Sequence, residues 1–332
     1  MMTRWLAAGL AACVVATVTP VSAQPKTVRV AFVWDEPLGR MPPELWSSFR
    51  ESLRTHGWEE GRNLTFERRN VARSEQAQLA EQLERLKVDV IVASPPSAFA
   101  LRPAAAVEGC RTAVVFAAVS DPVAARMVTT LARPGRCMTG ISYLGLELNV
   151  KRLELLTQAV PGATRIGVLV PAQHELRQRM RDDVAAGARD LKVTPLFHAV
   201  SGDDTADREL VVVFEELVRQ RAQAVLGLQG PQFLKHRAQI ADLSIKHRLP
   251  GIFELELYPE AGCLMAYSPS LVEVYRQAAG YVDRILKGAR PADLPVDQPR
   301  KLDLVVNLKT AETIGLALPA PFLSRADRQI RQ

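Results

Sequence analysis

The most constraining feature of the sequence is a regular alternation of short β-branched segments with helical patterns. Strands are expected at 28–34, 88–92, 112–117 and 139–142, and segments with helical spacing of apolar residues separate them. Strands of this length that alternate with helices are typical of a parallel sheet covered by helices on both faces. The alternation therefore predicts an α/β fold.

Helical spacing of apolar residues defines the segments between these strands. Leu45, Phe49 and Leu53 recur every four residues, and Gly57 follows as a helix stop. Apolar residues also recur over 123–131, which predicts a helix between the third and fourth of these strands. An edge-like strand is expected at 63–69, and further helices are expected at 79–86 and 97–107.

The same alternation restarts after Pro161-Gly162. Two successive α/β units of similar size predict two Rossmann-like lobes, each with its own parallel sheet. Strands are expected at 165–170, 194–198, 224–228 and 250–253, with helices near 174–191, 205–220 and 232–247.

A strongly periodic helix at 271–286 and a strand at 302–306 follow both units. These late elements indicate that the chain crosses between the lobes more than once. We expect lobe 1 to comprise residues 26–143 plus about 268–290, and lobe 2 to comprise residues 144–266 plus about 295–320.

Residues 1–23 have the pattern of a secretory signal peptide. Arg4 precedes an apolar stretch that ends in Val21-Ser22-Ala23, so we expect cleavage after Ala23 and a periplasmic location. An uncleaved membrane anchor is disfavoured, because Thr and Pro residues at 17–20 interrupt the apolar stretch. A further alternative is a lipoprotein anchored through Cys13, since Leu-Ala-Ala-Cys at 10–13 looks like a lipoprotein cleavage box.

The charge distribution bears on whether the partner is a nucleic acid, and the cysteine count bears on which disulfides can form after export. The net charge of +6 is spread along the chain without a basic stripe, which argues against a nucleic-acid partner. After signal removal Cys110, Cys137 and Cys263 are left, an odd number that permits at most one internal bridge. Cys110 and Cys137 both precede expected strands, so a bridge between them and three unbridged thiols are both open interpretations.

Catalytic and metal-binding signatures are absent from the sequence. It contains no dinucleotide-binding glycine motif, phosphate-binding loop, nucleophile elbow or C-x-x-C pair. His174-Glu175 lacks the second histidine that a zinc helix needs, and the five histidines are scattered. We therefore predict no catalytic residue, no metal ligand and no cofactor.

Polar and aromatic residues follow the expected strands. In open parallel sheets, ligands bind outside the carboxyl ends of the strands, where loops can be polar without disturbing the core. These positions predict a small-molecule site in a cleft between the lobes. The candidate ligand-binding residues are Trp34, Asp35, Ser94, Pro95, Ser97, Ser120, Asp121, Tyr143, Gln229, Glu254 and Tyr267.

The candidate residues suit a small polar or zwitterionic ligand. Serine hydroxyls and helix N-terminal N–H groups would hold an anionic end, and Asp121 would hold a cationic end. Trp34 or Tyr143 would stack on an apolar part. Structural alternatives are helix capping by Ser97 and Ser120, a helix-entry role for Asp121, inter-lobe packing by the aromatic rings, and a strut role for Glu254 and Tyr267.

Several strings of the sequence resemble substrate-binding proteins of an ABC transporter family, the one that includes tryptophan- and phenylalanine-binding members. The strings are VDVIVA at 88–93, VFAAVSDPV at 115–123, LARPG at 131–135, KRLELL at 151–156, YVDRILKG at 281–288, PADLP at 291–295 and NLKTA at 307–311. The resemblance covers essentially the whole mature chain in order. It implies a type I periplasmic binding protein with two lobes, a hinge of three crossings and a ligand enclosed by cleft closure.

The sequence departs from the family's pattern at three places. The family's glycine-rich turn after the third strand is replaced by Ser94-Pro95-Pro96-Ser97, and its hinge glycines are replaced near 261–268. Members that resemble aromatic amino-acid binders carry an acidic residue in the loop occupied here by residues 229–232. This chain has none in that loop, which argues against an aromatic amino acid as ligand.

The expected function is therefore that of an exported solute-binding protein of an ABC importer, without enzymatic activity. Its expected partners are a small organic solute, with an amino acid or related compound as one candidate, and an inner-membrane permease with its ATPase. We expect a monomer. The alternatives are a ligand-sensing subunit for a membrane signalling partner and, behind it, an exported α/β enzyme.

Overall fold

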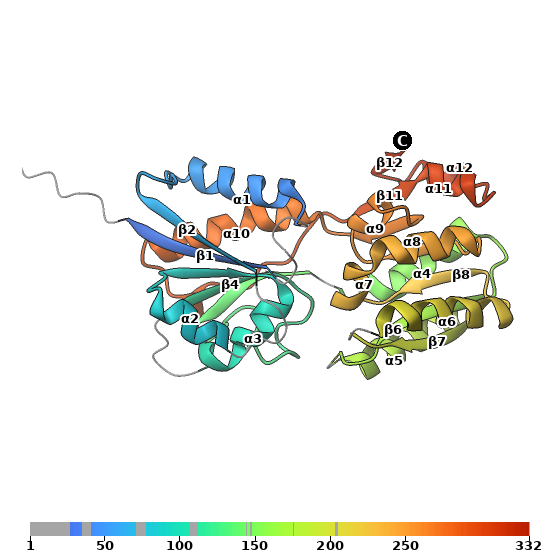
Figure 1. Ribbon diagram of the computed structural model, residues 1–332, viewed down its shortest axis with the longest axis horizontal. Helices are drawn as coiled ribbons and strands as arrows, with labels where there is room; N and C mark the ends of the chain where they lie inside the picture. The colour runs from blue at the N-terminus through green and yellow to red at the C-terminus, as the bar shows by residue number, and fades with distance from the viewer. Residues whose placement is uncertain are drawn as a thin grey trace, which may run out of the picture.

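Two α/β lobes lie side by side in the computed structural model (Figure 1). The structure describes residues 27–34, 41–70, 78–106, 112–143, 145–146, 148–174, 176–202 and 205–331. The expected signal peptide, Cys13, Asp35 and Cys110 lie outside these residues. None of the helices in the described ranges is long and apolar enough to span a membrane.

The first lobe is built on a five-stranded parallel sheet with the order β2-β1-β3-β4-β5. The expected edge strand is indeed at the edge, as β2. The strands are β1 (Val28–Trp34), β2 (Leu64–Asn70), β3 (Val90–Ala93), β4 (Ala113–Val119) and β5 (Met138–Ser142), and the helices are α1 (Pro43–Thr55), α2 (Leu79–Arg85), α3 (Pro95–Ala105) and α10 (Leu271–Leu286).

The alternation of side chains along β1 explains why helices cover both faces of this sheet. Val30 and Phe32 pack in one cluster with α1 and α10, whereas Ala31 and Val33 pack in another with α2 and α3. In Figure 1 the two helix pairs lie on opposite sides of the sheet. The expected helix stop at Gly57 is confirmed, because this residue has φ +91°, a conformation that favours glycine.

The prediction of a helix at 123–131 is wrong. Residues 121–131 form turns, in which the amide of Ala125 donates to the carbonyl of Asp121 and the amide of Met127 donates to the carbonyl of Pro122. Arg126 has φ +55°, which ends any right-handed helix after one turn. Met127 and Val128 are nevertheless buried, so the apolar spacing reflects burial of a turn.

The second lobe contains a seven-stranded sheet with the order β12-β11-β10-β9-β8-β6-β7. Its pairs are parallel except β10 with β11, which is antiparallel. The strands are β6 (Arg165–Pro171), β7 (Thr194–Val200), β8 (Ala224–Gly227), β9 (Gly251–Phe253), β10 (Met265–Ser268), β11 (Asp303–Asn307) and β12 (Arg328–Ile330).

Helices again cover this sheet. The single helix expected near 232–247 is two helices, because His236 leaves the helical conformation at φ −98° and ψ 19°. The helices are α4 (Leu148–Ala159), α5 (Arg177–Asp190), α6 (Ala206–Arg219), α7 (Pro231–Lys235), α8 (Arg237–Lys246), α9 (Leu257–Glu260), α11 (Leu308–Thr313) and α12 (Ala320–Leu323).

The chain passes between the sheets through three segments of the described ranges. The first joins β5 to α4, and the second joins β10 to α10, which packs against α1. The third leads from Asp297, which forms an isolated parallel bridge with Ile141, to β11 in the other sheet. These crossings bring the ends of both sheets to one place (Figure 1).

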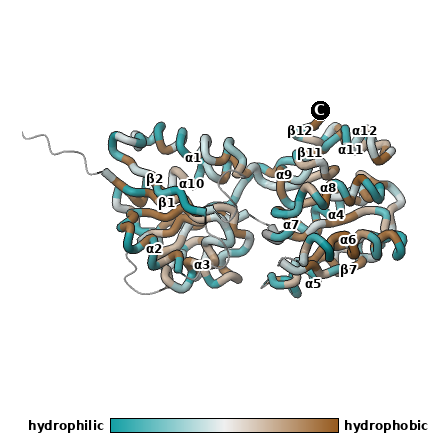
Figure 2. The backbone as a smooth tube through the Cα atoms, in the orientation of Figure 1, coloured by the Kyte–Doolittle hydropathy of each residue, from teal (hydrophilic) through white to brown (hydrophobic). Residues whose placement is uncertain are grey.

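One apolar cluster runs through this junction and joins the two lobes. It contains Phe32 and Tyr275 of the first lobe, Phe214 and Phe253 of the second, and Tyr143 after β5. In Figure 2 hydrophobic stretches follow the strands inside both lobes, whereas α1 includes hydrophilic stretches. The lobes therefore share buried apolar contact.

Candidate functional site

Side chains that follow the strands of one sheet contact residues of the other lobe. Ser120 and Asp121 follow β4 and Tyr143 follows β5, whereas Gln229 follows β8 and Glu254 follows β9. Three contacts join these ends across the lobes: Ser120 with Gln229, Asp121 with Arg179, and Tyr143 with Glu254. The structure thus brings together five of the candidate residues at the junction.

Asp121 is engaged by lobe 2 and by its own turn. The Nη1 group of Arg179 on α5 donates to its Oδ2 at 2.9 Å, and the amide of Ala124 donates to its Oδ1 at 2.9 Å. The Asp121 side chain is 16% exposed and that of Arg179 is 51% exposed. Arg179 is also 3.8 Å from Asp183 on the same helix. Asp121 therefore forms a partly exposed inter-lobe ion pair in this arrangement.

Gln229 contacts lobe 1 from the other side of the junction. Its Nε2 donates to Ser120 Oγ at 2.5 Å, and the Ser120 carbonyl accepts from Ser142 Oγ at 3.2 Å. Gln229 is buried, and its Oε1 has no hydrogen-bond partner among the described residues. Ser120 therefore uses its hydroxyl to join the lobes, in addition to any role at the start of the following turn.

Glu254 lies deep in the junction. Its carbonyl accepts from the Tyr143 hydroxyl, and its carboxylate accepts from the amide of Gly230 at 3.4 Å. Burial raises the pKa of Glu254 to about 7, against the opposing effect of the positive charge of Arg152. Burial also raises the pKa of Tyr143. An acidic side chain therefore does adjoin the 229–232 loop, although it comes from the end of β9.

Arg152 on α4 is a site residue that the sequence analysis did not identify. Its side chain is fully buried, and it donates from Nε to the carbonyl of Tyr267 at 2.9 Å and from Nη1 to the carbonyl of Gly145 at 3.1 Å. Nη1 also lies 3.1 Å from Asn149 Oδ1, and Nη2 has no partner among the described residues. The sequence does contain a sign of this burial. Arg152 lies four residues after Leu148 and four before Leu156, which places it on the apolar face of the helix.

Three lobe 1 candidates at the ends of β1 and β3 are buried, namely Trp34, Ser94 and Ser97, whereas Pro95 is half-buried. Trp34 is 5% exposed, its ring centroid is 5.9 Å from that of Tyr275, and its Nε1 has no partner among the described residues. Ser94 occupies the N-cap position of α3 without a side-chain cap bond, and its Oγ donates to Ser97 Oγ at 3.2 Å. Pro95 is the first residue of α3, so Ser97 lies inside the first turn and does not cap it.

Tyr267 lies within β10 and not after it, and its carbonyl is held by Arg152. Its side chain is half-buried against the second-lobe core. This arrangement gives Tyr267 a structural role at the second crossing. Contact of its ring with a ligand stays a prediction.

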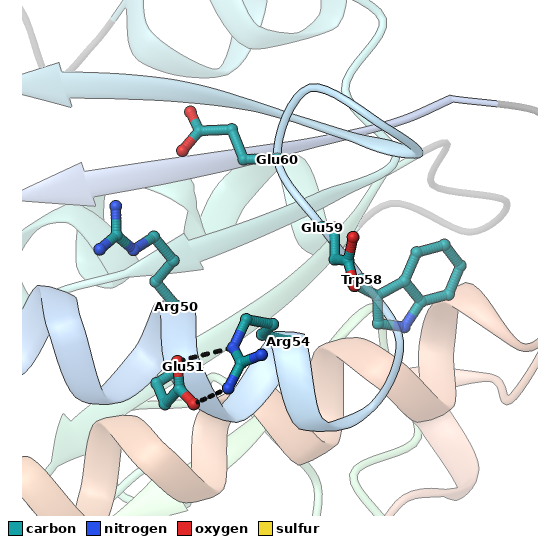
Figure 3. Close-up of a pocket in the computed structure, with 6 residues that line it drawn as sticks. All are labelled: Arg50, Glu51, Arg54, Trp58, Glu59 and Glu60. Atoms are coloured by element: carbon teal, nitrogen blue, oxygen red, sulfur yellow. Dashed lines mark hydrogen bonds and ion pairs between the residues drawn. The ribbon is translucent and has the colours of Figure 1, made fainter.

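A pocket in lobe 1, called here the hollow, is separate from this junction (Figure 3). It lies beside the end of α1 and the turn before β2, at the amino ends of the strands. An ion pair at 2.6 Å between Arg54 and Glu51 occupies part of it. No cluster of three metal-ligating side chains occurs among the described residues. The residues that line the hollow are Arg50, Glu51, Arg54, Trp58, Glu59 and Glu60.

Comparison with known proteins identifies relatives across most of the chain. The family model for ABC transporter substrate binding proteins matches residues 43–330. A tyrosine-binding protein of Clostridioides difficile (strain R20291) is 22% identical over 272 residues, which cover 81% of this chain and 75% of that protein.

Two solved structures show the same fold. A conserved domain protein from Vibrio cholerae matches with a TM-score of 0.80 and 24% identity, over 92% of this chain and 100% of that one. An ABC domain from Streptococcus pneumoniae in complex with L-Trp matches with a TM-score of 0.79 and 20% identity, over 92% of this chain and 100% of that one. Similarity at these identities extends to the fold, and the expected two-lobed α/β architecture is confirmed.

Proposed function

The chain belongs to the family of ABC transporter substrate-binding proteins, and we propose that it is the exported binding component of an importer, which captures a small organic solute between its lobes. The observation that carries this proposal is the convergence of polar strand-end side chains from both sheets. Ser120 with Gln229 and Asp121 with Arg179 join the lobes at the carboxyl ends of the strands, where open parallel sheets bind ligands.

The buried polar groups of the junction support a ligand with several hydrogen-bonding groups. Trp34 Nε1 is a buried donor without a partner among the described residues, and the Glu254 carboxylate accepts only a long bond from Gly230 among them. Such groups are costly to bury unless something completes their hydrogen bonds. A solute with both donors and acceptors would complete them, with Ser94, Ser97 and the start of α3 facing its anionic end.

An amino acid or related compound is the candidate class of solute. The relatives named for tyrosine and solved with L-Trp support it, although the 229–232 loop carries no acidic residue. Glu254 adjoins that loop through the Gly230 amide. Glu254, which follows β9, would therefore supply the acidic group that binds the ammonium of the solute.

Closure of the lobes would enclose the solute. In this proposal the moving bodies are residues 26–143 with about 268–290 and residues 144–266 with about 295–320. A solute favours the closed state only through contacts that the open state lacks, and inter-lobe groups such as Gln229 supply such contacts. The protein itself would act as a monomer, without a cofactor and without catalysis.

Location and partners follow from the same proposal. The signal-peptide pattern of residues 1–23 supports export to the periplasm, and the disulfide at Cys137 suits an oxidising compartment. The partner would be an inner-membrane permease with its ATPase, as for a substrate-binding protein of an ABC importer, and no nucleic acid is involved.

Native mass spectrometry of the protein as purified tests the proposal. We expect a bound solute of small mass that is lost on denaturation and rebinds with a 1:1 stoichiometry. A protein that carries no solute and rebinds none from a concentrated periplasmic extract would contradict a binding function. A bound mass that changes chemically with time would contradict the absence of catalysis.

A further inference from the structure

Gly145 lies in the first crossing between the lobes and is buried. A Cβ atom at this position would lie 1.9 Å from Gln229 Oε1, 2.9 Å from Gln229 Cδ and 2.9 Å from Ser120 Oγ. Separations this short do not occur between real atoms, so something must shift if residue 145 has a side chain. The φ angle of Gly145 is outside the left-handed region, so space and not backbone conformation requires glycine here.

The atoms that surround Gly145 belong to both lobes. Ser120 follows β4 of the first lobe and Gln229 follows β8 of the second, and the two side chains hydrogen-bond to each other beside the glycine. From lobe 2, Arg152 holds the Gly145 carbonyl at 3.1 Å and the carbonyl of Tyr267 at 2.9 Å. The buried Arg152 guanidinium thus binds the backbone of the first crossing and also the backbone of β10, the strand that precedes the second crossing.

Other crowded glycines differ in one respect. A Cβ at Gly167 would lie 2.6 Å from Leu217 Cδ2, and one at Gly227 would lie 2.2 Å from Phe253 Cδ1. These neighbours belong to the same lobe as the glycine and stay beside it whatever the lobes do. At Gly145 the glycine and Gln229 both belong to the expected lobe 2, and only Ser120 Oγ, at 2.9 Å, lies across the lobes. A Cβ at 145 would therefore act on closure by displacing the Gln229 side chain from its hydrogen bond to Ser120.

We propose that residue 145 sets the balance between open and closed lobes, and that glycine at this position is what allows Ser120 and Gln229 to meet. This inference rests on the proposed function, because it assumes that the lobes open and close. A side chain at 145 acts as a wedge that disfavours the closed arrangement while each lobe stays folded. Gly145 is in this sense a positioning residue for closure.

The rate of cross-linking between the lobes tests the proposal without a known ligand. The full chain carrying D121C and R179C is treated with a short bis-maleimide, because these positions are in contact across the lobes in this structure, which the proposal takes as the closed arrangement. Cys137 is disulfide-bonded and Cys263 is buried, and a protein without the two introduced cysteines measures the background reaction of Cys13 and Cys110. In a rapid open–closed equilibrium the rate reports the closed population even when that population is small.

We expect G145A to slow cross-linking by about tenfold, which corresponds to a bias of about 1.4 kcal/mol toward the open state, because Gln229 must leave Ser120 to make room for the Cβ. G280A is the matched control, because a Cβ there meets only His56 Nε2 at 3.9 Å. We expect it to cross-link at the parental rate. Far-UV circular dichroism and melting temperature verify that each variant is folded.

A double-mutant cycle separates the wedge from a general structural defect. Q229A removes the atoms that a Cβ at 145 would meet most closely, at the loss of the bond to Ser120. We expect G145A to slow cross-linking strongly in the parent and by less than about threefold in the Q229A background. Equal effects of G145A in both backgrounds, or no effect in the parent, overturn the inference. The solute measured by native mass spectrometry is independent of this rate, so the proposed function is tested separately.

Discussion

Asp121 shows that a residue type at a strand end does not by itself define its role. Its position predicted contact with a cationic group, and the cationic group in the structure is Arg179 of the other lobe. No local pattern in the sequence could identify this partner, because 58 positions separate the two residues. Arg152 was missed for a related reason, since an arginine in a helical pattern is normally an exposed residue.

Substitution of the inter-lobe ion pair should weaken solute binding modestly. Because Arg179 is half-exposed, the pair contributes about 0.2–1 kcal/mol, and D121A and R179A should each weaken affinity for the co-purified solute by up to about fivefold. The two effects should not add, and they should fade in 1 M salt. Isothermal titration measures them, with R177A on the same helix as control.

The outcome also decides what Asp121 contacts. A much larger loss for D121A than for R179A means that the carboxylate binds the solute directly, as its position in the sequence predicts. Unchanged affinity in D121A removes Asp121 from the site altogether.

Glu254 should make stability depend on pH. Its pKa of about 7 lies above the ordinary value of 4.5, so the protonated form favours folding. This contribution is complete below pH 4.5 and is lost as the pH rises through about 7. E254Q should therefore match the wild type near pH 4.5 and exceed its free energy of unfolding by up to about 3 kcal/mol at pH 8. Urea titrations at both pH values measure it; the exposed E312Q should show no such trend.

At the scale of helices and strands, periodicity predicted elements that bury a continuous face. The strand expected at 28–34 is β1, and the helix with Leu45, Phe49 and Leu53 buries those three residues. The segment 121–131 has helical spacing but folds as turns, because Arg126 takes a left-handed conformation that spacing does not encode. The antiparallel pairing of β11 with β10 was likewise not predictable, since it depends on where the third crossing ends.

The start of β5 should be stabilised by a disulfide. Cys137 is disulfide-bonded, whereas Cys263 is free and fully buried. We expect C137S to lower the free energy of unfolding by about 2–5 kcal/mol, through the larger freedom of its unfolded chain. A reductant should lower the urea midpoint of the wild type and leave that of C137S unchanged. Equal sensitivity of both proteins to reductant would show that the disulfide does not contribute.

At the scale of the whole molecule, the two lobes could be predicted because each repeats a self-contained β-α alternation. Their contact could not be predicted, because it depends on pairs such as Tyr143 with Glu254 that no local pattern specifies. The three crossings place these pairs at the ends of both sheets, and a single apolar cluster runs through them. The same junction therefore serves as the candidate ligand site and as part of the core.

This shared core should make the lobes unfold together. Trp34, Trp46 and Trp58 all belong to lobe 1, so tryptophan fluorescence of a protein expressed from residue 24 onward reports that lobe, whereas far-UV circular dichroism reports both. Phe214 is fully buried in the lobe 2 part of the shared cluster, and F214A should cost about 3–5 kcal/mol. Because the cluster is continuous, we expect the urea midpoints from both probes to coincide in the wild type and to fall together in F214A. A fluorescence midpoint that stays in place while the dichroism midpoint falls would show that the lobes are stabilised independently, with the junction contributing little to folding.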